Sequence, residues 1–206
     1  MPVEIEDVIS FLENQQLKYN VFMESKKILT SFATRNYTNE KGEHHLIIII
    51  ALEENGEFFK IFAPKCYVYA DEEFKKEVFQ TLLMITWRSK MLTFEYDATD
   101  GEICASVEFP IEDSTLTQKQ FLRAIFALVH VIDRYHSVIH KAITEGEVDF
   151  SGMEKGMLTM EMFQDLIHGL GQGLDLDSLV VQQNAPPTIE ELEEKDSVDD
   201  DSDEFI

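Results

Sequence analysis

The side chains in this chain best suited to hold an anion are cations spaced along one predicted helix, residues 118–143. Arg123, His130, Arg134 and Lys141 follow one another at intervals of seven, four and seven residues, which places them on one helical face. Two interpretations are open. The face is either a solvated surface whose cations are favoured near the helix C-terminus, or a docking surface for a nucleotide phosphate, a partner protein or the chain's own acidic tail.

A second cationic group stands at the end of another predicted helix, in the sequence Trp87-Arg88-Ser89-Lys90. An aromatic ring can stack on a base while neighbouring cations hold phosphates, which is the chemistry that a cyclic dinucleotide needs. The alternative is an ordinary helix C-terminus in which Trp87 packs inward. The candidate residues for an anionic or nucleotide ligand are therefore Trp87, Arg88, Lys90, Arg123 and Arg134.

His136 and His140 stand four residues apart, a spacing that can place two imidazoles around a metal ion. Zinc requires three or four ligands with supporting hydrogen bonds, and neither Cys66 nor Cys104 is near in sequence. We expect the two histidines to pack at the shoulder of the core with satisfied ring nitrogens and no metal.

The sequence contains no arrangement of residues typical of an enzyme. Phosphate-binding glycine loops and the nucleophile motif G-x-S-x-G are both missing from it. The segment "DATDGE" at 97–102 resembles a calcium loop, but its acidic residues are out of phase with the required ligand positions. We therefore predict a non-enzymatic protein without catalytic residues or a cofactor.

These side chains must be positioned by a sheet and three helices. Hydrophobic periodicity predicts helices at 3–16, 72–90 and 118–143, the last two capped by Asp71 and Thr117, and strands at 19–23, 28–34, 45–52, 58–63, 91–97 and 102–110, with Pro64 ending the fourth strand. Hairpin-linked strands with few crossovers indicate an α+β fold. The expected architecture is an antiparallel sheet of five or six strands packed by helices.

The helix predicted at 118–143 has an unusually wide apolar surface. Beside its core stripe lie Leu122, Phe126 and Val129, more than a single sheet face usually needs. This excess predicts either a homodimer contact or packing against the segment 157–170.

Charge and composition limit the classes of partner. The net charge is −23, and residues 188–206 alone hold ten acidic residues and one lysine. Such a field repels phosphate polyanions, so we expect no direct nucleic-acid binding. Two cysteines indicate a reducing cytoplasm with free thiols, and the apolar run "LIIIIAL" at 46–52 is far too short to span a membrane.

The stretch "LTFEYDATDGEICASVEFPIEDSTLTQKQFLRAIFALVHVIDRYHSVIHKA" at 92–142 resembles the YbjN family of bacterial sensory transduction regulators. The match lies in a strand, the "DGEI" turn, a strand ending in "FPIED" and a helix ending in "DRYH". The resemblance covers about residues 3–145. It implies a fold similar to that of type III secretion chaperones, which are small α+β homodimers that bind other proteins without catalysis.

Three regions follow from this organisation. Residues 1–145 form the predicted YbjN-like α+β domain, residues 146–181 a C-terminal extension with a short Met-rich helix, and residues 182–206 a disordered acidic tail.

Two functional hypotheses remain. The first is a cytoplasmic signal-transduction effector, a homodimer that binds a protein partner under the control of an anionic second messenger such as cyclic di-GMP. The alternative is a secretion-type chaperone or holdase whose Met-rich segment "MLTMEMFQDLI" covers an apolar segment of a client.

Overall fold

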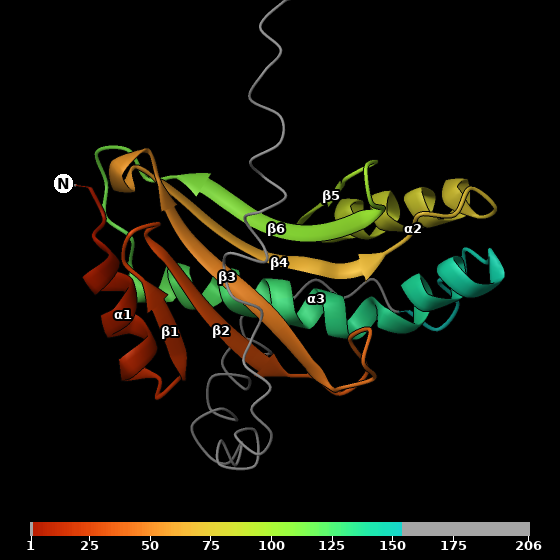
Figure 1. Cartoon of the computed structure of the whole chain (residues 1–206), viewed down its shortest axis with the longest axis horizontal. Helices are drawn as coiled ribbons and strands as arrows, with labels where there is room; N and C mark the ends of the chain where they lie inside the picture. Colours follow the sequence, from red (N-terminus) through yellow and green to blue (C-terminus); the bar gives the residue numbers. More distant parts are fainter. Residues whose placement is uncertain (1, 154–206) are drawn as a thin grey trace, which may run out of the picture. The chain divides into compact units, whose positions relative to one another are not determined.

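The structure is a computed structural model that describes residues 2–153, in which one antiparallel sheet packs with helices (Figure 1). The α-helices are α1 (Ile5–Asn14), α2 (Lys75–Arg88) and α3 (Gln118–Glu145). The strands are β1 (Tyr19–Phe22), β2 (Lys27–Ala33), β3 (His45–Glu53), β4 (Phe58–Val68), β5 (Thr93–Tyr96) and β6 (Glu102–Pro110), and a short 3-10 helix, η1 (Glu54–Gly56), joins β3 to β4. The expected α+β class and antiparallel sheet are confirmed.

The order of the strands determines which elements reach the edge of the sheet. It runs β1-β2-β3-β4-β6-β5, and every neighbouring pair is antiparallel. The first four strands form a meander. The chain then passes through α2 to β5, and β6 returns between β4 and β5. As a result, β5 forms one edge of the sheet and β1 forms the opposite edge.

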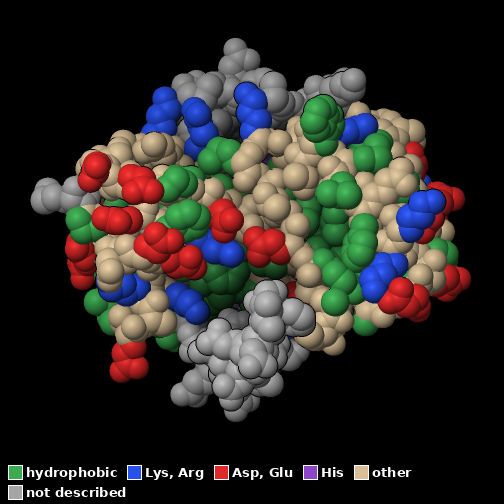
Figure 2. All heavy atoms as spheres, turned by 90° about the horizontal axis from the view of Figure 1, so that it is seen from above, with side chains coloured by type: hydrophobic (Ala, Val, Ile, Leu, Met, Phe, Trp, Pro, Cys, Tyr) green, Lys and Arg blue, Asp and Glu red, His purple; other side chains and the backbone are tan. Residues whose placement is uncertain are grey.

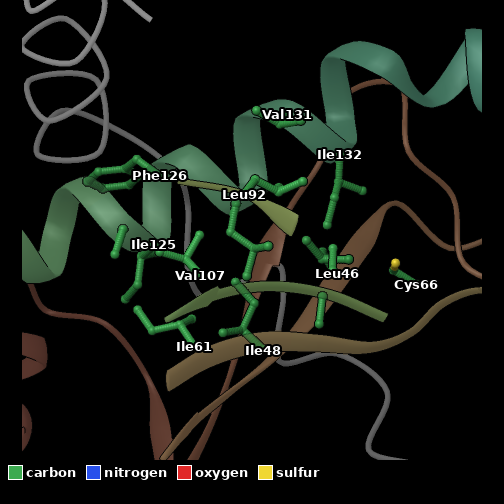
Figure 3. Packing of buried hydrophobic residues seen from close by; sticks show 14 of the residues in the cluster. Leu46, Ile48, Ile61, Cys66, Leu92, Val107, Ile125, Phe126, Val131 and Ile132 are labelled. Carbon is green, nitrogen blue, oxygen red and sulfur yellow. The ribbon is translucent and has the colours of Figure 1, made fainter. Parts of the chain in front are cut away.

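The core lies between one face of the sheet and α3 (Figure 3). Because side chains alternate along a strand, Leu46, Ile48 and Ile50 of β3 all point to this face and are buried. From α3, Ile125 and Ile132 are also fully buried. The core face of the sheet is therefore covered by one long helix, and the apolar stripe of α3 provides the contact.

Both ends of α3 are fixed by local interactions. Thr117 is the N-cap as predicted, and its hydroxyl accepts a hydrogen bond of 3.2 Å from the backbone N–H of Gln120. The helix ends at Gly146, whose φ of 66° is left-handed. A Cβ at Gly146 would lie 2.5 Å from the ring of Phe74, so the end of α3 packs closely against the start of α2.

The apolar excess beside the core stripe of α3 is covered within the chain. Leu122 and Phe126 are buried, and Val129 is half-buried against the core. The feature that suggested a dimer contact is thus accounted for by packing, while homodimerisation itself stays a prediction.

The prediction that Pro64 ends the fourth strand is wrong. β4 continues through Pro64 to Val68, and its register with β6 shifts between Ala63 and Tyr67. Proline is tolerated at such an irregularity because the ladder hydrogen bond is already missing there. The side chain of Glu102 takes the place of the ladder by accepting a hydrogen bond of 2.8 Å from the N–H of Lys65.

The prediction that Asp71 caps the second helix is also wrong. The Asp71 carboxylate accepts a hydrogen bond from the N–H of Glu73, which makes a turn before the helix. α2 begins only at Lys75, and the N–H of Phe74 donates to the hydroxyl of Tyr69 at 2.7 Å.

The remaining predictions about organisation are tested only in part. Cys66 and Cys104 are free thiols, as expected. Among the described helices, none combines the length and the apolar character needed to cross a bilayer. The Met-rich helix predicted near 157–174 and the acidic tail at 182–206 lie outside the described residues.

Candidate functional site

The outward side of α2 carries two large apolar side chains in contact with solvent. Leu83 is 70% exposed and Trp87, one turn further on, is 90% exposed. Met91, just beyond the helix, is 45% exposed. Figure 2, which views the molecule from the side where β5, β6 and α2 lie in Figure 1, shows hydrophobic side chains at the surface among charged ones. Large apolar side chains grouped in this way often mark an interaction site.

Packing of the opposite side of α2 fixes this orientation. Val78, Leu82 and Ile85 are buried in the core. At about 100° per residue, Leu83 and Trp87 then point away from that buried side. The exposure of Trp87 is therefore a consequence of the helix register. The alternative in which Trp87 packs inward is wrong.

Acidic residues are confined to the N-terminal end of this helix, where Glu72, Glu73 and Glu77 stand beside Lys76 in the sequence. No acidic residue occurs in the sequence from 78 to 94, whereas 40 of the 206 residues of the chain are acidic. We define the α2 outer face as the set of residues that share this exposed side and its continuation beyond the helix: Lys76, Gln80, Leu83, Trp87, Lys90 and Met91, all exposed. The face thus combines an apolar centre with flanking cations.

The cations predicted to act with Trp87 do not all lie with it. Lys90 is exposed on the α2 outer face, but the Arg88 guanidinium lies over the ring of Phe150 at 4.1 Å from its centroid. The Nη1 atom of Arg88 is buried, and no described residue accepts a hydrogen bond from it. Stacking of a base on Trp87 and binding of its phosphate by Arg88 would therefore need Arg88 to leave Phe150.

The two arginines of α3 lie far apart along the helix. Arg123 and Arg134 are separated by eleven residues, or about 16 Å at 1.5 Å per residue. The Arg134 guanidinium lies 5.8 Å from the ring of Tyr135, and that ring is 6.1 Å from Phe150. Arg88 and Arg134 therefore flank a pair of aromatic rings between α2 and α3, and Arg123 lies three turns away. Binding of an anion by these arginines stays a prediction.

His130 shows that the predicted basic face of α3 is not simply solvated. Its Nε2 atom is buried and has no hydrogen-bond partner among the described residues. Burial lowers the pKa of His130, and the positive charge of Arg134 lowers it further. His130 is therefore a neutral ring near neutral pH and adds no charge to this face.

Of the two histidines predicted to pack at the shoulder of the core, His136 does so, but the prediction is wrong for His140, which is exposed. The His136 ring stacks on Tyr67 with centroids 5.9 Å apart, and its Nδ1 lies 3.1 Å from the Tyr67 hydroxyl. Burial and the nearby His140 lower the pKa of His136. Within residues 2–153, no group of three or more His, Cys, Asp and Glu side chains is arranged to hold a metal, and the absence of a metal in the protein stays a prediction.

Asp133 has a structural role that the sequence did not indicate. Its Oδ1 accepts hydrogen bonds from the backbone N–H groups of Arg35, Asn36 and Tyr37 at 2.9, 2.7 and 2.9 Å. Three convergent N–H groups form a site for one negative charge. The loop between β2 and β3 is thereby attached to α3.

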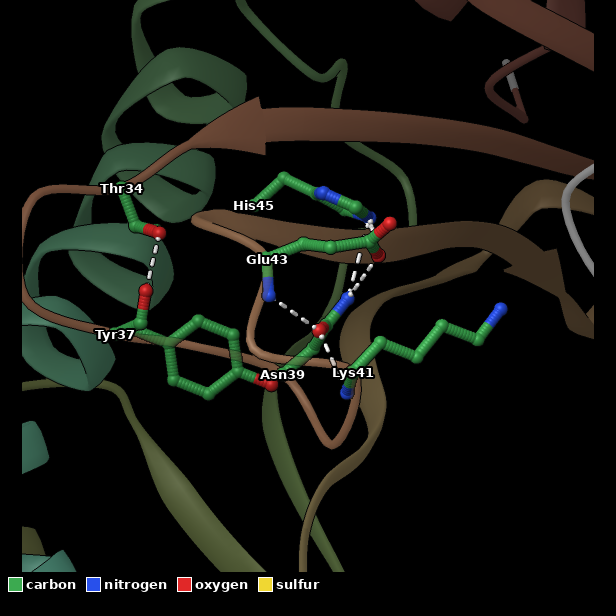
Figure 4. Close-up of polar contacts among 6 residues, drawn as sticks. All are labelled: Thr34, Tyr37, Asn39, Lys41, Glu43 and His45. Carbon is green, nitrogen blue, oxygen red and sulfur yellow. Dashed lines mark hydrogen bonds and ion pairs between the residues drawn. The ribbon is translucent and has the colours of Figure 1, made fainter. Parts of the chain in front are cut away.

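The same loop is also fixed internally (Figure 4). The Asn39 side chain accepts hydrogen bonds from the N–H groups of Lys41 and Glu43 and donates one to the Glu43 carboxylate. The Thr34 hydroxyl donates to the carbonyl of Tyr37 at 2.7 Å. These contacts explain the polar composition of this loop without a ligand.

A charged cluster on the other face of the sheet is likewise satisfied internally. Lys60 lies 3.7 Å from Glu95 and 3.4 Å from Glu108. The buried hydroxyl of Ser106 donates to Glu95 at 2.5 Å. Because each charge has a partner, this cluster stabilises the junction of β4, β6 and β5 and shows no sign of a ligand.

Comparison with known proteins finds solved structures with a similar backbone but no protein family with a matching sequence. No protein-family model matches the chain, and no curated protein matches its sequence. Among solved structures, YbjN from E. coli is similar with a TM-score of 0.48 and 9% identity, over 66% of this chain and 92% of that one. A chain of the HopA1–SchA chaperone–effector complex is similar with a TM-score of 0.43 and 10% identity, over 66% and 99%. These likenesses concern the backbone alone.

Proposed function

We propose that this chain is a non-enzymatic regulatory protein that binds a partner protein through the α2 outer face. The observation that carries the proposal is the 90% exposure of Trp87, the only tryptophan of the chain, beside the exposed Leu83. Tryptophan is the residue type most enriched among those that dominate binding energy at protein interfaces.

The free energy gained when a partner buries the Trp87 ring is large enough to support an interface. A buried aromatic side chain removes roughly 200 Å² from water, and at about 25 cal/mol per Å² this contributes about 5 kcal/mol before the costs of association. Leu83 would add to the gain as a smaller neighbour. A convex helix face with an apolar centre and a polar rim also matches the usual anatomy of protein interfaces.

A chaperone or holdase for an apolar client segment is the alternative function. It would use the Met-rich segment at 157–167, as predicted from the sequence, together with the exposed apolar side chains of α2. The two functions differ in what the partner looks like when it is free. A regulator binds a folded partner, whereas a holdase binds a segment that exposes apolar residues until it is covered.

Control by an anionic nucleotide such as cyclic di-GMP is a separate part of the proposal. It would depend on Arg88 and Arg134, which flank Phe150 and Tyr135. A thermal-shift screen with second messengers tests it, because a ligand that binds only the native state raises the unfolding temperature. We expect a nucleotide that raises the unfolding temperature of wild type but not that of Arg134→Ala. If no nucleotide raises the unfolding temperature of wild type, control by a nucleotide is refuted, and the docking proposal is unaffected.

The docking proposal is tested by quantitative capture from the organism that encodes the chain. Tagged wild type is compared with Trp87→Asp and with the control Met23→Asp. Met23 is 59% exposed and follows β1, at the opposite edge of the sheet from β5. We expect a partner that is retained by wild type and Met23→Asp and lost by Trp87→Asp. Equal capture by all three proteins would contradict the proposal.

Both substitutions should leave the fold intact, because exposed positions change stability by only about 0.5 kcal/mol. Urea unfolding of each variant is the control for this assumption. It separates loss of a docking surface from loss of the native state.

A further inference from the structure

The loop between β2 and β3, residues 34–44, is attached to the rest of the fold at two points. Within this loop only Tyr37 is buried, at 2% exposure, and its hydroxyl donates to the carbonyl of Cys66 at 3.0 Å. The second point is the carboxylate of Asp133, which accepts the three backbone N–H groups described above. The hydrogen bonds of the Asn39 side chain lie within the loop and involve neither point. The loop can therefore separate from the sheet and α3 without losing its own turn.

The buried side chain of the loop packs on a histidine. His136 of α3 lies edge-to-face with Tyr37, with ring centroids 5.5 Å apart, and stacks on Tyr67 of β4 at 5.9 Å. Its Nδ1 lies 3.1 Å from the Tyr67 hydroxyl, and the two tyrosine rings are 5.7 Å apart. We call these three rings the ring cluster. It joins the loop, β4 and α3 through a side chain type that changes charge between about pH 5 and 8.

The surroundings of His136 disfavour a positive charge on its ring. His140, one turn further along α3, has its ring centroid 5.8 Å away, and His44 stands at the end of the loop; both are exposed. The two tyrosine hydroxyls of the ring cluster stay neutral, because burial raises the pKa of each far above its usual value. Burial lowers the pKa of His136 most, and His140 and His44 lower it further. Among the described groups that act on His136, Asp133 alone favours its charged form.

We infer that the ring cluster is an acid-sensitive contact, in which protonation of His136, reinforced by charge on His44 and His140, favours release of the β2–β3 loop. In the closed loop a charged His136 ring has to be desolvated between two tyrosines, whereas water surrounds it once the loop is released. Release also separates His44 from the two histidines of α3, which relieves like-charge repulsion. Both effects act in the same direction.

The closed loop binds fewer protons than the released loop, because the pKa of His136 is lowered only while its ring is covered. The closed state therefore has its full stability above about pH 6.5 and loses stability as the pH falls through the lowered pKa. Release would uncover Tyr37 and Tyr67, which are 2% and 8% exposed in the closed state, and so present an aromatic surface in acid. The α2 outer face takes no part in this contact, so the inference does not depend on the proposed docking.

Hydrogen exchange of the full-length chain tests the inference. The readout is the protection of the N–H groups of Arg35, Asn36 and Tyr37, which donate to Asp133. Protection is taken relative to the exchange rate of an unstructured peptide at the same pH, so that the chemical effect of pH cancels. In wild type it should fall by about fivefold or more between about pH 7.5 and 5.5. At each pH these amides should be much less protected than those at the centre of β3, residues 48–50, because the loop opens without unfolding of the sheet.

Four variants assign the effect to the ring cluster. His136→Phe keeps a ring in place but cannot be protonated, so its loop protection should not depend on pH. His44→Gln and His140→Gln replace exposed side chains, and each should reduce the fall seen in wild type. His45→Gln is the matched control, because His45 is a titrating ring at the same end of the loop but pairs with Glu43 at 3.6 Å, outside the ring cluster (Figure 4). This control should keep the fall of wild type.

Three results would overturn the inference. Loop protection in wild type that is unchanged between the two pH values would show that acid does not release the loop. A fall in His136→Phe as large as in wild type would assign the effect to another group. Loop amides as well protected as the centre of β3 would show that the loop opens only when the whole domain unfolds. If His136→Phe does not fold, the two exposed variants decide, and a fall of wild-type size in both His44→Gln and His140→Gln would overturn the inference.

Discussion

Replacing Asp133 by alanine should destabilise the protein through loss of the contact between α3 and the loop after β2. The Asp133 carboxylate accepts three backbone hydrogen bonds of 2.7 to 2.9 Å, from Arg35, Asn36 and Tyr37. A hydrogen bond to a charged group contributes about 1.5–3 kcal/mol. Two of the three donors are solvent-exposed, and the three bonds share one acceptor. We therefore expect Asp133→Ala to lower the free energy of unfolding by about 3 kcal/mol in total, less than the sum of three separate hydrogen bonds.

Urea unfolding followed by far-UV circular dichroism measures this loss. For a chain of this size, about 3 kcal/mol corresponds to a fall in Tm of roughly 6–12 °C. Asp133→Asn keeps an oxygen acceptor without the charge and should lose about half as much. Asp113→Ala, at an exposed position in the loop before α3, is the control. An Asp133→Ala protein as stable as this control would refute the reasoning.

Three further predictions concern other parts of the fold. Gly56→Ala should lower the free energy of urea unfolding by about 2–3 kcal/mol, because the new Cβ would lie 2.2 Å from the Val3 carbonyl oxygen. Gly42 also has a positive φ but has open space around it, so Gly42→Ala should lower the free energy of unfolding less, and equal losses would contradict the close-contact argument. Thr117→Ala should cost about 1 kcal/mol through loss of the helix cap, whereas Thr117→Ser should retain most of that stability. Burial lowers the pKa of His136, so this histidine binds fewer protons in the native protein than in the unfolded chain. Its contribution to stability is therefore present above about pH 6.5 and is lost as the pH falls through the lowered pKa. His136→Gln should therefore flatten the decline in unfolding free energy between about pH 7.5 and 5.5, and an unchanged slope would contradict this.

Elements governed by local periodicity were predictable from the sequence. The long apolar stripe and the Thr117 cap located α3 correctly, because both signals lie within the helix itself. The errors arose where distant residues override a local rule. Pro64 stays within β4 because the Glu102 side chain, from another strand, bonds to the backbone at Lys65.

The candidate site was predictable in residue type but not in geometry. Sequence marks Trp87 and Arg88 as a ring beside a cation, but the two side chains leave the helix about 100° apart. Only packing of α2 decides that the ring faces solvent and that the guanidinium lies on Phe150. The role of Asp133 was missed for a related reason, since its backbone partners lie at least 96 residues away in sequence.

The intrinsic fluorescence of Trp87 tests the central claim most directly, because the chain contains no other tryptophan. In the free protein, acrylamide should quench this emission as readily as that of tryptophan in water, in keeping with 90% exposure. The partner captured by wild type should be added in a form without tryptophan, with each of its tryptophans replaced by phenylalanine. Complex formation should then shift the emission to the blue and protect it from acrylamide. Emission that remains equally quenchable in the saturated complex would contradict docking on the α2 outer face.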